Sequence, residues 1–307
     1  GEEKIMMLTP LIQSFRPSAC PAEWRGLLPH LVRRPDPVLA EQEHFRLKLA
    51  ETPVEVVAAQ KLRYRVFKQE QGRLANCNDG IDRDRFDRHC RHLIVTEKER
   101  GRIVGTYRVL SGAGAAAAGG FYSEEEFEVH GLRQLRGEVC EVGRSCVDPE
   151  FRSGAVVALL WSGLGALRRR PEPGRGWLHR YAGRRRSEKP AFHYLFGCVS
   201  LEERDPVAAL ALYEYFKRNE MISTRLQATP RPGFELDRVP SAEVMRYFEE
   251  HEKQMERTLP PLFKGYIKLG AKICGAPAYD REFGTIDFLI LLDMREMPER
   301  YARRFLN

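Results

Sequence analysis

Two charged residues of opposite sign, Glu141 and Arg144, stand three positions apart in the alternating segment EVCEVGRSCV at 138–147. The segment predicts a strand, and strict alternation places these two side chains on opposite faces of it. Transfer of an acyl group to an amine needs a general base, and partial burial raises the pKa of a carboxyl toward that task. Glu141 is therefore the candidate base, with a structural Glu–Arg pair at a sheet edge as the alternative.

A second group of charged residues lies upstream, in the stretch DGIDRDRFDRHC at 79–90. Its carboxylates can bind a cationic amine or a divalent metal, or they are simply solvated, because three arginines between them neutralise their charge locally. The sequence leaves these three interpretations open. The carboxylates are Asp82, Asp84 and Asp87, and the arginines are Arg83, Arg85 and Arg88.

The turn that follows the candidate strand, PEFRSGA at 149–155, opens an apolar helix. Free backbone N–H groups and the helix dipole favour an anion there, such as the phosphate of phosphopantetheine, and Gly154 permits close approach. The turn lacks the glycine spacing GxGxxG and the GK[ST] of a P-loop, which disfavours dinucleotide and ATP binding. An ordinary strand-to-helix connection is the alternative.

Basic residues outnumber acidic ones by 50 to 43, which gives a formal charge of +7. They gather between residues 168 and 186, where the only acid is Glu172 and where Trp177 and Tyr181 are interleaved. This basic segment is a solvated loop, a patch for an anionic membrane or an acidic carrier protein, or a nucleic-acid site; composition does not separate the three. Its arginines are Arg168, Arg169, Arg170, Arg175, Arg180, Arg184, Arg185 and Arg186.

The composition is that of a folded chain, with 43% hydrophobic and 30% charged residues among 307. These values exclude disordered, collagenous and fibrous classes. The longest apolar run, from Ala155 to Leu167, is shorter than the roughly 20 residues that span a bilayer, and no secretory signal is recognised, so we expect a cytoplasmic protein. Seven dispersed cysteines without CxxC spacing predict neither disulfides nor a zinc site.

A sheet and several helices must bring the candidate residues together, and the periodicity predicts both. We expect residues 1–40, which contain six prolines, to form an N-terminal arm and residues 41–307 to form one domain. The order of elements indicates an α/β or α+β domain with a mixed central sheet flanked by helices. Helices are predicted at 54–67, after the turn at 149–155, and at 207–218, and strands at 92–97, 102–110, 138–147, 192–201 and 286–292.

Two shorter segments carry specific expectations. The run SGAGAAAAGG at 111–120 contains only small residues and predicts a flexible loop that forms a flap or lines a narrow channel. The segment SEEEF at 123–127 predicts a helix start, with Ser123 as the N-cap and Glu126 at the capping-box position.

Eight segments follow one another in an order that is specific as a joint pattern: RYRVF (63–67), DRFDRHCRHLIV (84–95), IVGTYRVL (103–110), GFYSEEEFEV (120–129), EVGRSCVDPEFRSG (141–154), ALLW (158–161), YLFGCVS (194–200) and PPLFKGYIKLGAKICG (260–275). Together they resemble the bacterial ornithine-acyl-carrier-protein N-acyltransferases, a family grouped with N-acyl amino acid synthases and hemolysin-like proteins. The resemblance covers about residues 40 to 305.

The resemblance implies a fold similar to the GCN5-related N-acetyltransferases and the N-acyl-homoserine-lactone synthases, with a central mixed sheet split around the acyl thioester. It implies transfer of a long-chain, often 3-hydroxy, acyl group from acyl carrier protein to the α-amine of an amino acid, usually ornithine. The product is a lyso-aminolipid. The alternatives are another acceptor such as glycine or glutamine, an acyl-coenzyme A donor, or a membrane-binding hemolysin-like protein.

The resemblance also assigns roles to single residues. It implies a catalytic group of Glu141, Arg144 and Asp87. It implies substrate-binding residues at Arg65, Phe67, Asp84 and Arg108. It implies an acyl-phosphopantetheine site at Val147, Arg152, Ser153, Gly154 and Ala155. Glu141, directly or through a water, would deprotonate the acceptor, and a backbone N–H of the central strand would stabilise the oxyanion. An acyl-enzyme on Cys146 is the less favoured route.

Two departures bear on the substrates. The stretch KQEQGRLANCN at 68–78 contains no tryptophan after the RxxxF element, which disfavours lactone chemistry. The phosphate turn has its glycine one position earlier than the [RQ]xxGx[GA] of coenzyme A-dependent relatives, so acyl carrier protein is the favoured donor. Docking of this acidic partner, or of the inner-membrane surface, is expected at Arg168, Arg169, Arg170, Arg184, Arg185 and Arg186. No permanently bound cofactor, no metal and no nucleic-acid partner is expected.

Overall fold

The computed structural model describes residues 38–70, 79–135, 139–152, 154–169, 190–201 and 204–306. Residues 38–307 form one compact unit. Residues 1–37 of the predicted arm lie outside the described residues. So do five of the predicted site residues: Ser153, Arg170, Arg184, Arg185 and Arg186.

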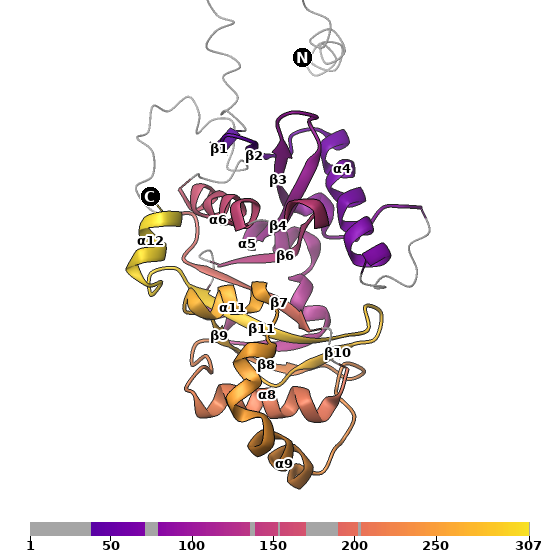
Figure 1. Cartoon of the computed structure of the whole chain (residues 1–307), viewed down its shortest axis with the longest axis vertical. Coiled ribbons are helices and arrows are strands. Elements are labelled where there is room, and N and C mark those ends of the chain that lie inside the picture. Colours follow the sequence, from indigo (N-terminus) through magenta and orange to yellow (C-terminus); the bar gives the residue numbers. More distant parts are fainter. Residues whose placement is uncertain are drawn as a thin grey trace, which may run out of the picture. The chain divides into compact units, whose positions relative to one another are not determined.

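A nine-stranded sheet forms the centre of the fold (Figure 1). Its strands follow the order β1-β2-β3-β4-β6-β7-β11-β10, with β9 paired to β11. The pair β6–β7 is parallel and the other pairs are antiparallel, so the predicted α/β class with a mixed sheet is confirmed. The strands are β1 (Val38–Glu41), β2 (Phe45–Leu49), β3 (Arg91–Glu97), β4 (Ile103–Ser111), β6 (Val139–Val147), β7 (Tyr194–Leu201), β9 (Lys272–Ile273), β10 (Ala278–Asp280) and β11 (Thr285–Asp293). Strands β5 (Phe127–His130) and β8 (Gln227–Pro230) pair separately.

Helices surround the sheet, and the predicted ones are confirmed. The first begins with a capping box between Thr52 and Glu55 and with Pro53 at its first turn, which fixes its start. The helices are α4 (Pro53–Tyr64), α5 (Gly112–Ala118), α6 (Gly154–Arg168), α8 (Pro206–Arg218), α9 (Ser241–His251), α10 (Met255–Thr258), α11 (Pro261–Lys268) and α12 (Glu299–Phe305). The π- and 3-10 turns are η3 (Arg65–Glu70), η4 (Asp87–His89), η5 (Tyr122–Glu125), η6 (Leu132–Leu135), η7 (Pro149–Phe151) and η8 (Glu252–Gln254).

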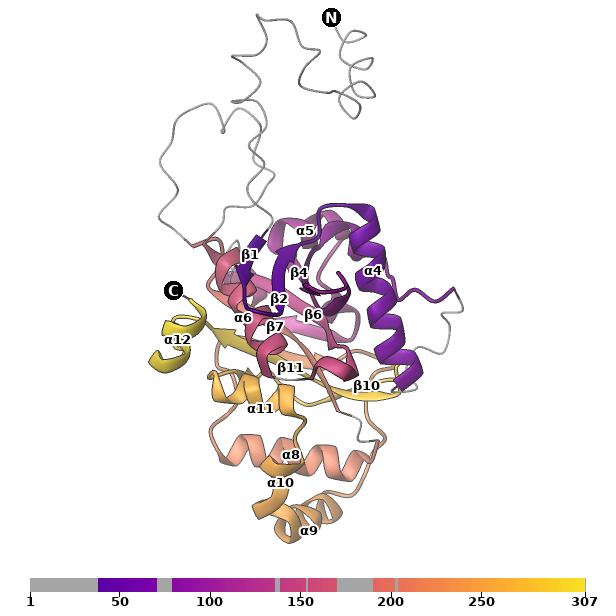
Figure 2. The same cartoon turned by 45° about the horizontal axis from the view of Figure 1, so that its top comes forward.

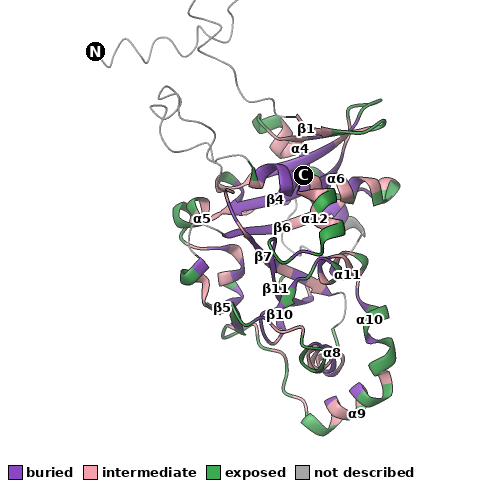
Figure 3. Ribbon diagram, turned by 90° about the vertical axis from the view of Figure 1, so that its left-hand side faces the viewer, coloured by how far each residue is buried: buried purple, intermediate pink, exposed green. Residues whose placement is uncertain are grey.

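Both faces of the sheet are packed, as the side chains of β11 demonstrate. Phe288 and Ile290 join a large hydrophobic cluster with α6, α8 and α11, whereas Leu289 and Leu291 join a second cluster with α5 and the β5–β8 pair. This alternation is the period of two that a strand imposes. Figure 3 shows the central strands β4 and β6 as buried, while α9 and α10 carry exposed surface. Helices α8 and α9 lie beyond β11, at the end of the sheet away from β1 (Figures 1 and 2).

The parallel pair opens along its length. Its pairing covers Val139–Glu141 opposite Tyr194–Phe196, and the rest of β6 is not paired with β7. Just past the last pair, a Cβ on Gly197 would lie 2.2 Å from the carbonyl oxygen of Val142, so only glycine fits there. The split that the resemblance implies is therefore present in the sheet, and it lies between β6 and β7 beyond their last pair.

The predicted flexible loop at 111–120 is wrong, because this segment contains helix α5. Ser111 caps it by accepting a hydrogen bond from the Gly114 N–H, and Gly119 ends it with a left-handed φ of 84°. Alanine has the highest helix propensity, so four consecutive alanines between two good caps favour a helix over a loop. The small side chains reflect close packing, since a Cβ on Gly114 would lie 2.6 Å from the His89 carbonyl oxygen.

Candidate active site

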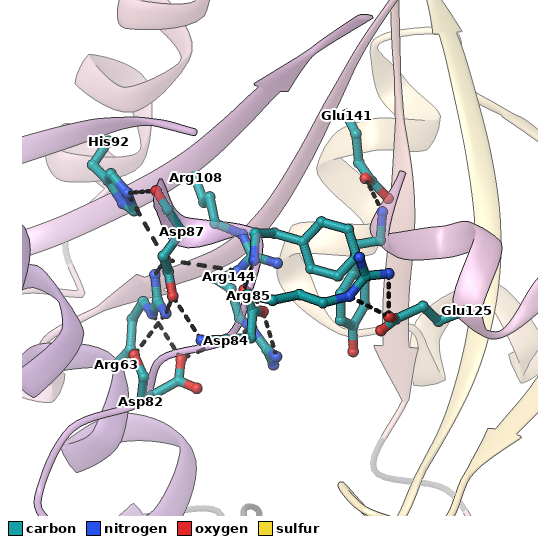
Figure 4. A network of polar contacts seen from close by, with 12 residues as sticks. Arg63, Asp82, Asp84, Arg85, Asp87, His92, Arg108, Glu125, Glu141 and Arg144 are labelled. Atoms are coloured by element: carbon teal, nitrogen blue, oxygen red, sulfur yellow. Dashed lines mark hydrogen bonds and ion pairs between the residues drawn. The ribbon is translucent and has the colours of Figure 1, made fainter. Parts of the chain in front are cut away.

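The buried guanidinium of Arg63, near the end of α4, is the centre of an ion-pair network (Figure 4). Its Nε donates to Asp82 Oδ2 at 2.7 Å, and its Nη atoms donate to the Asp87 carboxylate at 2.8 and 3.0 Å and to the Asp82 carbonyl at 2.7 Å. On the far side of Asp87, His92 lies with its Nε2 3.0 Å from the Asp87 carbonyl oxygen. Arg63 thus fixes the loop that precedes β3 against α4.

Asp84 connects this network to the central strands. Arg108 of β4 donates to Asp84 Oδ2 at 2.5 Å, and Arg144 of β6 donates to the same oxygen at 3.3 Å. A second ion pair joins Arg144 Nε to Asp82 Oδ2 at 3.8 Å. The structure therefore brings together four of the predicted residues, namely Asp84, Asp87, Arg108 and Arg144. Three arginines face three carboxylates in this group, which we call the arginine cluster: Arg63, Arg108, Arg144, Asp82, Asp84 and Asp87.

The arginines keep this cluster ionised. Burial alone would raise the pKa of Asp84, yet Arg108 and Arg144 bring that pKa below its ordinary value. For Asp87, burial is likewise outweighed, chiefly by hydrogen bonds and charge from Arg63, so its pKa is strongly lowered. Interpretation of these acids as a solvated loop is wrong, because Asp82 and Asp87 are buried and bound to arginine.

A β-bulge sets the position of Arg144. In the pairing of β4 with β6, Thr106 lies opposite Cys146 and Arg108 lies opposite Gly143. Two residues of β6, at 144 and 145, therefore lie opposite the single residue 107 of β4. Arg144 has a φ of 50°, which is unusual for a residue with a side chain. The strict alternation predicted for 138–147 therefore does not hold. The guanidinium lies 4.4 Å from the ring centre of Phe283 and 5.1 Å from that of Tyr122.

Glu141 occupies a different environment, away from the arginines. Its carboxylate accepts hydrogen bonds at 2.7 Å from the backbone N–H groups of Tyr122 and Ser123, and another from Ser123 Oγ. Burial raises the pKa of Glu141, and the hydrogen bonds from Ser123 and Tyr122 limit that rise. The carboxylate thus has the raised pKa expected of a base, and it also holds the first turn of η5.

The prediction that Ser123 and Glu126 form a capping box is wrong. Turn η5 begins at Tyr122, and the Glu124 carboxylate accepts from the Phe121 N–H at 2.8 Å. Ser123 donates to Glu141 instead of capping a helix, because β6 places a buried carboxylate beneath it. Glu126 does not cap η5, and it lines a cavity.

This cavity, of about 230 Å³, lies between η5, β6 and the turn that joins β10 to β11. It is smaller than the pockets of ~300–1,000 Å³ that hold drug-sized ligands. Arginines and carboxylates share its wall, which suits a small zwitterion. It is lined by Asp82, Arg83, Asp84, Tyr122, Glu125, Glu126, Arg144, Gly233, Phe234, Asp280, Arg281, Glu282 and Phe283.

A second group of acids lies near the cavity, and two of its members, Glu126 and Asp280, line it. The Glu126 carboxylate, Cys198 Sγ and an Asp287 oxygen all lie within 4.8 Å of one another, close enough to contact one metal ion. Burial raises the pKa of Glu126 well above its ordinary value, and the neighbouring Asp287 and Asp280 raise it further. Burial also raises the pKa of the Cys198 thiol, and a protonated thiol is a poor metal ligand. We call Glu126, Asp280 and Asp287 the acidic cluster.

Two predicted substrate-binding residues lie apart from the cavity. Arg65 is half-exposed and pairs with Asp148 at 3.1 Å, beside the turn at 149–155. Phe67 packs with Cys146 in a small hydrophobic cluster under α4. Burial raises the pKa of Cys146 to about 12, which removes the thiolate that an acyl-enzyme route would need.

The predicted donor site is partly described. Strand β6 ends at Val147, Arg152 is exposed, and α6 begins at Gly154 and Ala155, where a Cβ on Gly154 would meet no atom within 4 Å. The described arginines of the basic segment, Arg168 and Arg169, stand at the opposite end of α6, about 21 Å away at 1.5 Å per residue. Arg168 Nε donates to the Phe192 carbonyl at 3.1 Å, and Arg169 donates to that of Leu306.

Sequence reasoning missed two residues of the site. Arg63 was overlooked in favour of Arg65, although Arg63 is the arginine that stands four positions before Phe67 and so fits RxxxF. Glu126 was assigned to a cap. Its role had no local signal, because the residues around it come from β7, β10 and β11.

Residues 62–162 match the acetyltransferase (GNAT) domain family, and this match together with the two relatives that follow shows an acyltransferase. The chain is 33% identical over 277 residues to the L-ornithine N(alpha)-acyltransferase of Brucella abortus (strain 2308), covering 86% of this chain and 89% of that protein. It is 33% identical over 266 residues to that of Agrobacterium fabrum (strain C58), covering 83% and 82%. The chain belongs to the L-ornithine N(alpha)-acyltransferase family, which confirms the resemblance.

The solved structures that the chain resembles are more distant in sequence. FeeM, an N-acyl amino acid synthase from uncultured soil microbes, is 12% identical with a TM-score of 0.43, over 83% of this chain and 95% of that one. The AHL synthase LasI is 11% identical with a TM-score of 0.42, over 86% and 95%. Within the described residues, no helix combines the length and the apolar character that a membrane span requires.

Proposed function

We propose that this chain transfers a long-chain 3-hydroxyacyl group from acyl carrier protein to the α-amine of ornithine, giving a lyso-aminolipid. The main support is the likeness to four proteins named L-ornithine N(alpha)-acyltransferase, at 28% to 33% identity over at least 83% of this chain. The cavity adds a physical reason, since its wall offers arginine to a carboxylate and acids to an amine.

In the proposed reaction the α-ammonium loses a proton, the neutral amine nitrogen attacks the thioester carbon, and the nitrogen then loses a second proton. The tetrahedral intermediate then collapses: a C–N bond has formed, the C–S bond breaks, and the phosphopantetheine sulfur leaves and takes up a proton. Glu141 is proposed as the base, reached through a water or through Ser123 Oγ, which already donates to it. A backbone N–H on β6 would stabilise the oxyanion.

The other predicted residues take supporting roles in this proposal. Arg144, which lines the cavity, would bind the acceptor carboxylate, because a guanidinium matches the geometry of that group. Asp84, Asp87 and Arg108 would position Arg144 through the arginine cluster. The donor arm would enter along β6 to the start of α6, with no permanently bound cofactor.

The test is an in vitro reaction of the purified chain with 3-hydroxyacyl carrier protein and ornithine, read by mass spectrometry. Nα-acylornithine in the wild type and loss of at least about 100-fold in Glu141→Gln are expected. Product only with glycine or glutamine overturns the acceptor, and product only with acyl-coenzyme A overturns the donor. Because an amide at 141 would oppose two backbone donors, unfolding of Glu141→Gln is measured beside it, with the exposed Glu128→Gln as the matched control.

The base assignment has its own readout. If Glu141 must be ionised, kcat/KM rises with pH through its raised pKa, and this acidic limb disappears in Glu141→Gln. If Glu141→Gln retains some activity and its kcat/KM shows the same acidic limb as wild type, a group other than Glu141 accepts the proton of the acceptor amine.

The docking role of the basic segment remains a prediction. Neutralising Arg184, Arg185 and Arg186 together is expected to raise KM for the carrier-protein donor, and the effect should shrink as salt screens the charges. An unchanged KM with weaker binding to anionic vesicles assigns the segment to the membrane surface.

A further inference from the structure

The two groups of carboxylates that border the cavity differ in what compensates them. Asp84 is bound by Arg108 and Arg144, so its charge is already neutralised. Glu126 is only 2% exposed, and its Oε1 has no hydrogen-bond partner within the described part of the chain. Its other oxygen accepts a weak contact from Cys198 Sγ at 3.7 Å. The cavity thus contains one buried carboxylate with an open acceptor.

The surroundings of Glu126 supply more negative charge than compensation: a hydrogen bond from Tyr122 and the charge of Arg144 lower its pKa, but burial, Asp287 and Asp280 raise it by more. An oxygen of the buried Asp287 carboxylate lies within 4.8 Å of the Glu126 carboxylate. Asp280 lines the same cavity, and its Oδ1 accepts from the backbone N–H groups of Glu282 and Phe283 at 2.8 and 3.0 Å. Burying ionised carboxylates together is unfavourable unless a proton or a bound cation offsets their charge, so this arrangement suits a cation.

We propose that Glu126, together with Asp280 and Asp287, binds the side-chain ammonium of the acceptor amino acid. This inference rests on the proposed function, because it assigns the second amine of ornithine to a place in the same cavity. An alkylammonium group has three N–H donors and no acceptor, which matches a wall of carboxylate oxygens. The α-carboxylate would then lie toward Arg144, which lines the same cavity.

The subsite also explains how two amines of one substrate are distinguished. Only an unprotonated amine attacks a thioester, and a nearby anion favours the protonated, charged form of an amine. Ion pairing to the acidic cluster therefore keeps the side-chain amine unreactive and leaves the α-amine to react. Glu126 is a specificity-determining residue in this account, and it takes no proton from the reacting nitrogen.

A divalent metal is the rival occupant of the same place. The observation against it is Cys198, whose Sγ lies 3.4 Å from Ser123 Oγ and whose burial raises its pKa and favours the protonated thiol. A metal would need that thiol deprotonated or would have to rely on two carboxylates.

The test compares ornithine with norvaline, which has the same carbon chain without the terminal amine, as acceptors for wild type and Glu126→Gln. We expect wild type to prefer ornithine by about 100-fold in kcat/KM, and Glu126→Gln to lower that ratio to less than about 10-fold, chiefly by losing ornithine activity. Tandem mass spectrometry should also show Nδ-acylornithine appearing in the variant. Glu128→Gln, an exposed glutamate on β5, should keep the wild-type ratio.

Each other result overturns a distinct claim. A wild type that acylates both acceptors equally overturns the ammonium subsite and leaves the acyltransferase intact. If Glu126→Gln keeps the wild-type preference for ornithine over norvaline, the ammonium subsite is likewise overturned and the acyltransferase is left intact. Turnover of neither acceptor removes the proposed function together with the subsite. Activity that is lost in EDTA and restored by Zn²⁺ or Mn²⁺ assigns the cluster to a metal. Should Glu126→Gln not fold, 5-hydroxynorvaline, in which a neutral hydroxyl replaces the terminal amine of ornithine, tests the charge on the wild type.

Discussion

The arginine cluster and the acidic cluster contain similar carboxylates in opposite electrostatic environments. In the first, three arginines lower the pKa values of Asp84 and Asp87 despite burial. In the second, burial and neighbouring acids raise the pKa of Glu126. A carboxylate's neighbours, more than its depth, therefore decide its charge state.

The two clusters differ in what their acids lie beside. The arginine cluster joins α4, the loop before β3 and strands β4 and β6 through ion pairs, and one of its members, Arg144, also lines the cavity. In the acidic cluster, Glu126 lines the cavity and its Oε1 has no hydrogen-bond partner within the described residues. Three changes test this distinction.

Arg63→Ala should produce the largest loss of stability. It leaves Asp82 and Asp87 buried without their main partner, and removing one partner of a buried ion pair costs about 3–5 kcal/mol. The measurement is the free energy of unfolding in urea. Arg303→Ala is the control, since that exposed arginine pairs with Glu299 on α12 and should change stability by less than about 0.5 kcal/mol. Equal effects of the two substitutions would remove the structural role of the arginine cluster.

Ser123→Ala should lower the free energy of unfolding by an intermediate amount, because it removes a hydrogen bond to the Glu141 carboxylate. Loss of a hydrogen bond to a carboxylate costs about 1.5–3 kcal/mol. Because Ser123 holds the pKa of Glu141 down, the pKa should rise further, and the acidic limb of kcat/KM should move to higher pH. Ser162→Ala, which removes a hydrogen bond to the Ala158 carbonyl within α6, should leave that limb in place. A limb that does not move in Ser123→Ala contradicts the role of Glu141 as the base.

Glu126→Gln should have the smallest effect on the free energy of unfolding, and the sign of that effect should depend on pH. The folded pKa of Glu126 is raised, so wild-type stability falls as pH rises above the unfolded value of about 4.3. Glutamine does not ionise, so the variant should gain about 1–3 kcal/mol over wild type at pH 8 and lose this advantage at pH 4. Asp87→Asn should behave oppositely, because a lowered folded pKa gives stability that is present above about pH 3.9 and is lost as pH falls. A pH-independent difference for Glu126→Gln would show that its carboxylate is compensated.

Local sequence patterns were sufficient for most of the elements. A charged turn between two apolar segments located β3 and β4, alternation located β6, and apolar runs located β7 and β11. Helical spacing located α4, an apolar run after a turn located α6, and Pro206 marked the start of α8. Those signals suffice because the side-chain period of a strand or helix is a property of neighbouring residues. The failed prediction at 111–120 came from weighing glycine above the run of alanines that forms α5.

The candidate site was predicted only in part. The order of its motifs led to Asp84, Asp87, Arg108, Glu141 and Arg144, and four of these meet in one network. The bulge that turns Arg144 toward Tyr122 was invisible, because it depends on the register of β6 against β4. The same is true of Glu141, whose hydrogen-bond partners lie 18 and 19 positions earlier.

The sequence by itself determined the fold class, the family and the residue types available for chemistry, since these follow from periodicity and from the order of motifs. The tertiary structure decided which acids are neutralised and which are not. Asp84 and Glu126 look alike in the sequence, each followed by further charged or aromatic residues. One lies beside two arginines and the other beside Asp287, because electrostatic interaction depends on distance in space and not on separation along the chain.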